Sequence, residues 1–253
     1  MPEAENPSYL FGSMHVRDQR AFQGMEKVHS CIEACEALAL EIDLSQDHEW
    51  TDPALLQFPD GGSLRDHLRP HIFERLRKSI LKAFQIDLNF FGPFIPLALV
   101  EIISERIMQS DHPTFLDAYL CDYATQLGKT TLGLETRDSQ QALLLRIPME
   151  AQLKMLLEIG RNPHHYRSLL NHMTQLYQKG DLRALHKVSR KSAGGLRKWM
   201  LFDRNRVMAN RIYSFMQSQS LFCAVGAAHL WGGKGVLRLL KQQGVKVKAI
   251  PLV

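Results

Sequence analysis

Short apolar segments of strand character stand near the two ends of the chain, and longer segments with helical spacing fill its middle. The short segments are too brief for stable helices and are partly β-branched, which is typical of strands buried in a parallel sheet. They cover residues 9–15, 38–44, 130–135, 221–225 and 245–250. The pattern therefore predicts a sheet assembled from strands that are far apart in the sequence.

Apolar residues recur at helical spacing in the long segments between these strands. Helices are predicted over 64–84, 94–109 and 114–127, across much of 148–217, and over 236–243, with breaks at prolines and glycines. A chain of 253 residues can bury a substantial core. We therefore predict an α/β fold in one domain, residues 1–253, with a central and mostly parallel sheet and helical insertions at about 60–128 and 148–217.

The balance of charge argues against a nucleic-acid partner. The formal net charge is +5, but the 31 basic and 26 acidic residues are interspersed. The densest basic stretches, 183–197 and 204–211, have the spacing of helix surfaces. A nucleic-acid site would show a basic face with stacking aromatic residues or a known module, and the sequence contains neither.

Features of the sequence that bear on location favour the cytoplasm. Four cysteines are too few for a disulfide framework in a chain of this size, and they indicate buried free thiols in a reducing compartment: Cys31, Cys35, Cys121 and Cys223. Residues 1–7 have no basic or apolar leader segment, and the most apolar stretch, 90–107, is interrupted by Gly, Pro and Glu. We expect no transmembrane segment and a cytoplasmic protein, or a secreted or periplasmic one if a leader has been removed.

A Gly-x-x-His pattern occurs twice, each time directly after a predicted strand. The two copies are Gly12-Ser13-Met14-His15 and Gly226-Ala227-Ala228-His229. Such a pattern places an imidazole at the carboxyl edge of the sheet, where open α/β sheets bind their ligands. We therefore expect His15 and His229 to meet at one site.

Two carboxylates, Glu41 and Glu135, also lie within or just beyond predicted strands. Two neutral imidazoles with one or two carboxylates are a common ligand set for a catalytic divalent ion, which can lower the pKa of bound water to about 7. One carboxylate could instead stay off the metal and act as a general base. The residue types alone do not decide between these two roles. They also allow a third interpretation, in which both carboxylates face water and have no role in a site.

Further motifs follow in a fixed order along the chain. They are Ser8 to His15, Leu38 to Leu44, Gly133-Leu134-Glu135-Thr136 with Gln140, Tyr177 with Gly180-Asp181-Leu182, Arg204-Asn205 with Met208 and Ile212, and Val225 to Leu230 with Gly235, Val236, Leu239, Leu240 and Gly244. This ordered set resembles the TraB/PrgY/GumN family, whose eukaryotic relatives are the Tiki proteins. The resemblance runs from about residue 8 to the C-terminus.

The resemblance implies a fold similar to that of erythromycin esterase and ChaN-like haem-binding proteins, and a metalloprotease that acts on a peptide or protein substrate. It implies a divalent ion, Mn, Co or Zn, held by His15, His229 and a carboxylate, Glu41 or Glu135. Glu41 or Glu135 would handle the proton. It also implies that Arg204, with Asn205, positions the substrate or stabilises an oxyanion. Without the resemblance, Arg204 and Asn205 would be interpreted as a solvated helix face.

Two other functions fit the same residues. A non-enzymatic protein could bind haem or a peptide at the same edge of the sheet, as the ChaN resemblance allows. A catalytically silent interaction protein could use the matching residues only to hold the sheet edges together. The chain has no Gly-x-Ser-x-Gly motif, which argues against a serine hydrolase of the α/β-hydrolase type.

Overall fold

The computed structural model describes residues 7–45, 56–58 and 60–252. The chain divides into two compact units. Unit 1 comprises Met1–Trp50, Ser110–Arg137 and Met173–Val253, and unit 2 comprises Thr51–Gln109 and Asp138–His172. The predicted helical insertions, 60–128 and 148–217, overlap unit 2 but do not have the same limits. The organisation of residues 1–253 as a single domain stays a prediction.

Unit 1 contains a parallel sheet whose four strands come from distant parts of the chain. They are β1 (Tyr9–Ser13), β2 (Ala37–Leu40), β3 (Thr130–Gly133) and β4 (Leu221–Gly226), in the spatial order β1-β4-β2-β3. Every pairing between them is parallel. The prediction of an α/β fold with a mostly parallel sheet is confirmed.

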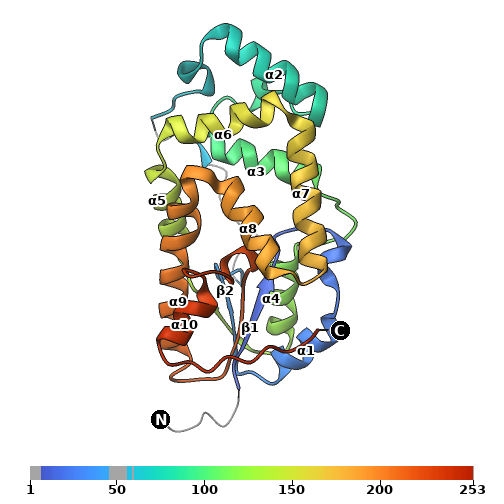
Figure 1. Cartoon of the computed structure of the whole chain (residues 1–253), viewed down its shortest axis with the longest axis vertical. Helices are drawn as coiled ribbons and strands as arrows, with labels where there is room; N and C mark the ends of the chain where they lie inside the picture. The colour runs from blue at the N-terminus through green and yellow to red at the C-terminus, as the bar shows by residue number, and fades with distance from the viewer. Residues whose placement is uncertain (1–6, 46–55, 59, 253) are drawn as a thin grey trace. The chain divides into compact units, whose positions relative to one another are not determined.

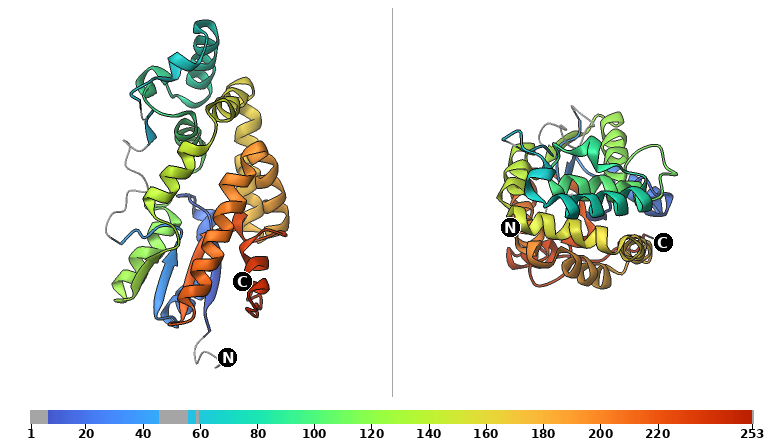
Figure 2. Two further views of the ribbon diagram at one scale, coloured as in Figure 1. Left: turned by 90° about the vertical axis from the view of Figure 1, so that its left-hand side faces the viewer. Right: turned by 90° about the horizontal axis from the view of Figure 1, so that it is seen from above.

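The most C-terminal strand, β4, lies between the two most N-terminal strands. Its residues pair with β1 from Phe222 to Gly226 and with β2 from Leu221 to Cys223. The blue N-terminal and orange C-terminal segments are accordingly neighbours in both Figure 1 and the turned view of Figure 2. Because the strands are parallel, all four end at the same edge of the sheet.

Helices cover both faces of the sheet in unit 1. On one face, Met208, Ile212 and Leu240 pack against β2 and β4, and on the other face α4 packs against β2 and β3 (Figure 1). The helices of this unit are α1 (Met25–Glu33), α4 (Leu116–Gln126), α8 (Leu182–Ala193), α9 (Arg204–Phe215) and α10 (Val236–Gln242). Short helical turns connect them: η1 (Gln19–Phe22), η5 (Gly194–Leu196), the π-helix η6 (Lys198–Asp203) and η7 (Ala227–His229).

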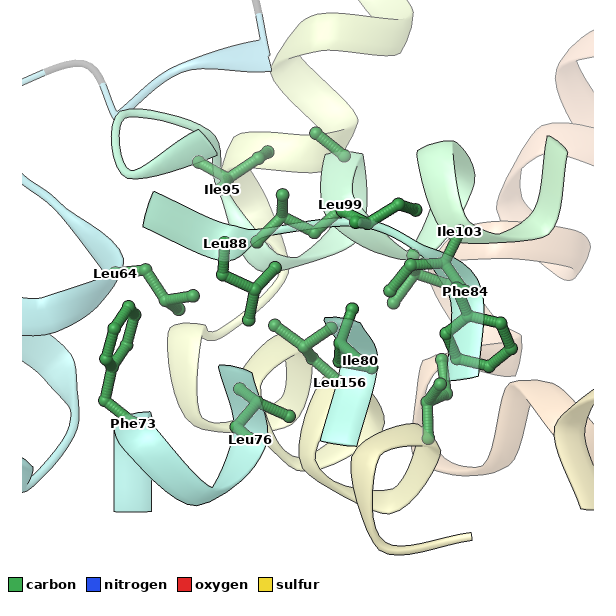
Figure 3. Close-up of a cluster of buried hydrophobic side chains, with 14 of the residues drawn as sticks. Leu64, Phe73, Leu76, Ile80, Phe84, Leu88, Ile95, Leu99, Ile103 and Leu156 are labelled. Carbon is green, nitrogen blue, oxygen red and sulfur yellow. The ribbon is translucent and has the colours of Figure 1, made fainter. Parts of the chain in front are cut away.

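Unit 2 is helical and has an apolar core of its own. Phe73, Leu76, Ile80 and Phe84 repeat every three or four positions along one face of α2, and they pack with side chains of α3 and α6 (Figure 3). Its elements are η3 (Leu64–His67), α2 (Pro70–Phe84), η4 (Leu88–Phe91), α3 (Pro96–Ile107), α6 (Met149–Arg161) and all but the first residue of α5 (Arg137–Arg146). Helix α7 (Pro163–Gln178) begins in unit 2 and ends in unit 1.

The prediction of a fifth strand over residues 245–250 is wrong. These residues form no regular element, and Val247 and Ile250 are exposed. Alternating valine and lysine has the period of a strand, but a segment becomes a strand only when a neighbouring strand offers it hydrogen bonds.

Two other findings bear on the sequence predictions. All four cysteines carry free thiols, and three of them are buried. Within the described residues, no helix combines the length and the apolar character that crossing a bilayer requires.

Candidate functional site

The carboxyl edge of the sheet gathers the residues that the sequence singled out. Glu41 follows β2 directly, and His15 and Glu135 stand two residues beyond the ends of β1 and β3. His229 stands three residues beyond β4, at the end of the turn η7. The location predicted for all four residues therefore agrees with the strand ends.

Arg204, the first residue of α9, binds both carboxylates. Its Nε lies 2.9 Å and its Nη2 2.6 Å from Glu135 Oε2, and Nη2 also donates to Glu41 Oε2. Both glutamates are more than nine-tenths buried, and a buried carboxylate is costly without a charged or hydrogen-bonding partner. The guanidinium therefore fixes the two carboxylates next to each other.

Glu41 is held in its ionised form. Its second oxygen, Oε1, accepts a hydrogen bond of 2.7 Å from the backbone N–H of Gly226. Burial by itself would raise the pKa of Glu41, but the charge of Arg204 and these hydrogen bonds outweigh it and lower the pKa to about 2. Glu41 is therefore an anion at neutral pH.

Asn205 fixes the orientation and the tautomer of His229. The Asn205 side-chain Nδ2 donates to the carbonyl oxygen of Lys234 at 2.7 Å, so its Oδ1 faces the imidazole and accepts from Nδ1 at 2.6 Å. The ring proton is thus on Nδ1, and the lone pair on Nε2 faces Glu41 Oε1 at 3.9 Å. Burial lowers the pKa of His229 to about 4, so the ring is neutral at pH 7.

The donor chemistry of this pair suits a divalent metal ion. A neutral imidazole nitrogen and an ionised carboxylate face each other without a proton between them, and the other ring nitrogen is held by a hydrogen bond, as metal-bound histidines usually are. Across residues 7–45, 56–58 and 60–252, no three His, Cys, Asp or Glu side chains form a group that could hold a metal ion. The ligand roles predicted for His15, His229, Glu41 and Glu135 all stay predictions.

His15 lies beside a different acid. Its Nδ1 is 3.4 Å from Asp117 Oδ2, and its ring stacks on Phe115 with a centroid distance of 4.2 Å. Asp117, in the first turn of α4, also accepts a hydrogen bond of 2.6 Å from Ser13 Oγ. The two Gly-x-x-His motifs therefore present their imidazoles to different partners.

Close contacts explain the glycine of each motif. A Cβ on Gly12 would lie 2.8 Å from Leu230 Cδ1 and 3.1 Å from Ala227 Cβ, so the first motif packs directly on the turn formed by the second. A Cβ on Gly226 would lie 3.1 Å from Glu41 Oε1 and 3.3 Å from the ring of His229. The missing side chains allow the close approach of the two turns and of His229 to Glu41.

The solvated helix face suggested for Arg204 and Asn205 is wrong, because both side chains point into the site. Asn205 is fully buried and the Arg204 side chain is only 18% exposed. The π-helix η6 ends directly before Arg204, and such distortions often occur at functional sites.

Sequence reasoning missed two residues near the site, Asp117 and His186. His186 Nδ1 lies 3.0 Å from the carbonyl oxygen of Ala228, which places the ring against the turn that carries His229. Each of them is a polar residue on the apolar face of a predicted helix, and this position in the sequence could have marked it. In the structure both residues are buried. Such a residue needs a polar partner, which distant parts of the chain supply.

Comparison with curated proteins finds distant relatives. The chain is 23% identical to metalloprotease TIKI2 of Danio rerio over 99% of its length and 60% of that protein, and 23% identical to metalloprotease TIKI2 of Xenopus tropicalis over 97% of its length and 58% of that protein. It is 20% identical to metalloprotease TIKI1 of Danio rerio, over 97% of its length and 61% of the relative. The chain thus spans about 60% of the length of the curated relatives it matches.

No solved structure matches the chain at a significant level. The family model of the TraB/PrgY/gumN family matches residues 3–249, which is nearly the whole chain and includes every residue of the site. The chain belongs to the TraB/PrgY/gumN family.

Proposed function

We propose that this protein is a metal-dependent hydrolase that cleaves peptide bonds, with His229 and Glu41 holding a divalent ion. The observation that carries this proposal is the pair itself: a buried neutral imidazole whose Nε2 lone pair faces a buried carboxylate at 3.9 Å. Two electron-pair donors in this arrangement attract a cation. The names of the relatives, which are metalloproteases, support the same reaction class.

When bound, the ion would supply a Lewis acid that polarises a carbonyl group and acidifies water. The side chains around it have separate tasks. Asn205 keeps the Nε2 of His229 unprotonated, and Arg204 and the N–H of Gly226 keep Glu41 ionised and fixed in place. Arg204 is therefore first of all a positioning residue for the two carboxylates, and its role at a substrate oxyanion is part of the proposal.

The metal content of the protein tests the proposal. Purified protein would be stripped with a chelator, loaded with Mn²⁺, Co²⁺ or Zn²⁺, desalted and measured by elemental analysis. We expect about one ion per chain in the wild type and its loss in His229→Ala and in Glu41→Gln, because each removes one of the two ligands. His164→Ala, a change of an exposed histidine outside the site, should retain the ion.

A metal-loaded sample would then be incubated with a peptide library, and cleavage should stop on chelation and return with the ion. If the wild type binds none of the three ions, the metal-dependent hydrolase is refuted. A saturable Soret shift on addition of haem, lost in His229→Ala, would then assign the site to a haem-binding protein.

A further inference from the structure

Peptide hydrolysis needs a residue that accepts a proton from the attacking water and returns it to the leaving nitrogen. At the carboxyl edge of the sheet, Glu41 and Glu135 are both bound by Arg204, and Nδ1 of His229 is bound by Asn205. The first Gly-x-x-His motif places a second imidazole at this edge, and its partner is a different acid, Asp117.

We infer that the two Gly-x-x-His histidines have different tasks: His229 holds the metal, whereas His15 and Asp117 form a dyad that transfers the proton. In this dyad His15 is the catalytic residue and Asp117 is its positioning residue. The inference rests on the proposed function for the reaction it serves, but the arrangement of the dyad can be tested without any substrate.

Asp117 has the surroundings of a carboxylate that orients a histidine. Its side chain is 5% exposed, and its two oxygens face two different groups. Oδ1 accepts from Ser13 Oγ at 2.6 Å, and Oδ2 lies 3.4 Å from His15 Nδ1. Both groups belong to the first Gly-x-x-His motif, so one buried acid holds the whole turn.

The ring of His15 has a defined orientation. It stacks on Phe115 with an interplanar angle of 4°, and its Nδ1 faces the carboxylate. Because a carboxylate accepts hydrogen bonds and cannot donate them, the dyad requires the proton of the neutral ring on Nδ1 and the lone pair on Nε2, and this tautomer is part of the inference. The side chain is 26% exposed, which leaves the ring accessible to a reacting molecule.

The partners of the two histidines differ in charge. His229 faces the neutral amide of Asn205, whereas His15 faces the carboxylate of Asp117. A buried carboxylate stabilises the imidazolium that forms when the ring accepts a proton, as in the His-Asp pair of serine proteases. A neutral amide gives no such stabilisation, which suits a permanently neutral metal ligand.

The backbone holds the dyad next to the metal-binding turn. Tyr177 donates from its hydroxyl to the carbonyl oxygen of Gly12 at 2.9 Å, and burial with the charge of Asp117 raises the pKa of this phenol, so it remains a donor. Gly12 packs on Ala227 and Leu230, and Ser13 pairs in register with Gly226. His15 and His229 are therefore carried by neighbouring turns.

The proton balance of the proposed reaction is simple. Water attacks the peptide carbonyl carbon, a C–O bond forms, and one water proton passes to His15 Nε2. The C–N bond then breaks, and the imidazolium returns this proton to the leaving nitrogen. His15 ends in the form in which it began, and no oxidant or co-reactant is required.

The first test separates the tasks of the two histidines by metal content. With Zn²⁺ or Mn²⁺ as the probe, His15→Ala and Asp117→Asn should bind the ion within about twofold of the wild type, whereas His229→Ala should lose it. If His15→Ala loses the ion to the same degree as His229→Ala, His15 is a ligand and the inference is overturned.

The second test uses the wild type alone and needs no activity. Long-range ¹H–¹⁵N spectra, assigned with His15→Ala, should show His15 protonated on Nδ1 and unprotonated on Nε2 at a pH where the ring is neutral. In Asp117→Asn this tautomer should lose its preference. A wild-type ring that carries its proton on Nε2 refutes the dyad, whatever the outcome of the metal experiment.

The third test applies to any peptide that the wild type cleaves. Asp117→Asn should lower kcat by at least about 100-fold and change the pH profile, with KM little altered, because the acid acts on the proton and not on the substrate. Equal losses in kcat and in folded protein, or an unchanged pH profile, would leave Asp117 as a structural residue and overturn the inference.

Discussion

Two consecutive residues of α9 serve two different partners. Successive positions of an α-helix are about 100° apart, so Arg204 faces the carboxylates of Glu41 and Glu135 while Asn205 faces His229. Neither partner is close to α9 in the sequence. The chemistry of these two residues was therefore predictable only through the family resemblance, since charged neighbours such as Asp203 and Arg206 make the segment look like a helix surface.

Replacing Asn205 should weaken metal binding at the proposed site without removing either proposed ligand. Asn205→Ala deletes the acceptor that keeps the proton of His229 on Nδ1, so we expect metal affinity to fall by about 10-fold to 100-fold. Titration with Zn²⁺ against a competing chelator measures this change. Asn210→Ala, in the same helix but exposed, is the control and should keep the wild-type affinity. Equal affinity in both variants would contradict the role given to Asn205.

At the scale of elements, the placement of the site residues at strand ends was predicted better than the lengths of the strands. Three of the four strands, β1, β2 and β3, are shorter than the segments predicted for them, and β4 is one residue longer. Glu41, Glu135 and both histidines nevertheless lie just beyond the strand ends. An apolar run indicates which residues are buried. The length of a strand depends instead on how many of these residues pair with a neighbouring strand. The same reasoning failed for residues 245–250, which alternate like a strand but have no partner.

The short helix η1 depends on one buried acid. Asp18 accepts from the N–H of Arg20 at 3.0 Å and from its guanidinium Nε at 2.8 Å, and it is fully buried. Burial would raise the pKa of Asp18, but the hydrogen bonds and charge of Arg20 outweigh it, and the pKa lies below the usual 3.8. The native state therefore favours the ionised form more than the unfolded state does.

We expect Asp18→Asn to lower the free energy of unfolding by about 1–3 kcal/mol at pH 7. A depressed native pKa gives stability that is present above the unfolded pKa and is lost as the pH falls through the native one. The difference between wild type and variant should therefore shrink as the pH falls below about 4. Urea unfolding at a series of pH values measures it, and a constant difference would refute this account.

At the scale of the whole molecule, the site belongs to one unit. Every residue assigned to it lies in unit 1, while unit 2 has a separate core around α2, α3 and α6. The sequence predicted helical insertions but not their limits, because a helix pattern does not say which core receives its apolar face. Helices α4, α8 and α9 fall inside the predicted insertions and yet lie in unit 1.

A cavity in unit 2 should therefore leave the proposed metal site intact. Ile80→Ala removes a fully buried side chain and should destabilise unit 2 by about 2–5 kcal/mol, whereas Leu81→Ala, one position along the same helix and 36% exposed, should cost less than about 1 kcal/mol. Hydrogen exchange should show faster opening of α2, α3 and α6 in Ile80→Ala, with wild-type metal content. Loss of the metal in that variant would contradict the separation.

The position of β4 between β1 and β2 has a consequence for synthesis on the ribosome. Until residues 221–226 emerge, β1 and β2 have no common neighbour, and neither Gly226 nor His229 can meet Glu41. A nascent or prematurely released chain therefore carries unpaired strand edges, which are prone to aggregate. It also carries no assembled site, because the residues at the ends of β1, β2 and β4 come together only after β4 has been synthesised and paired.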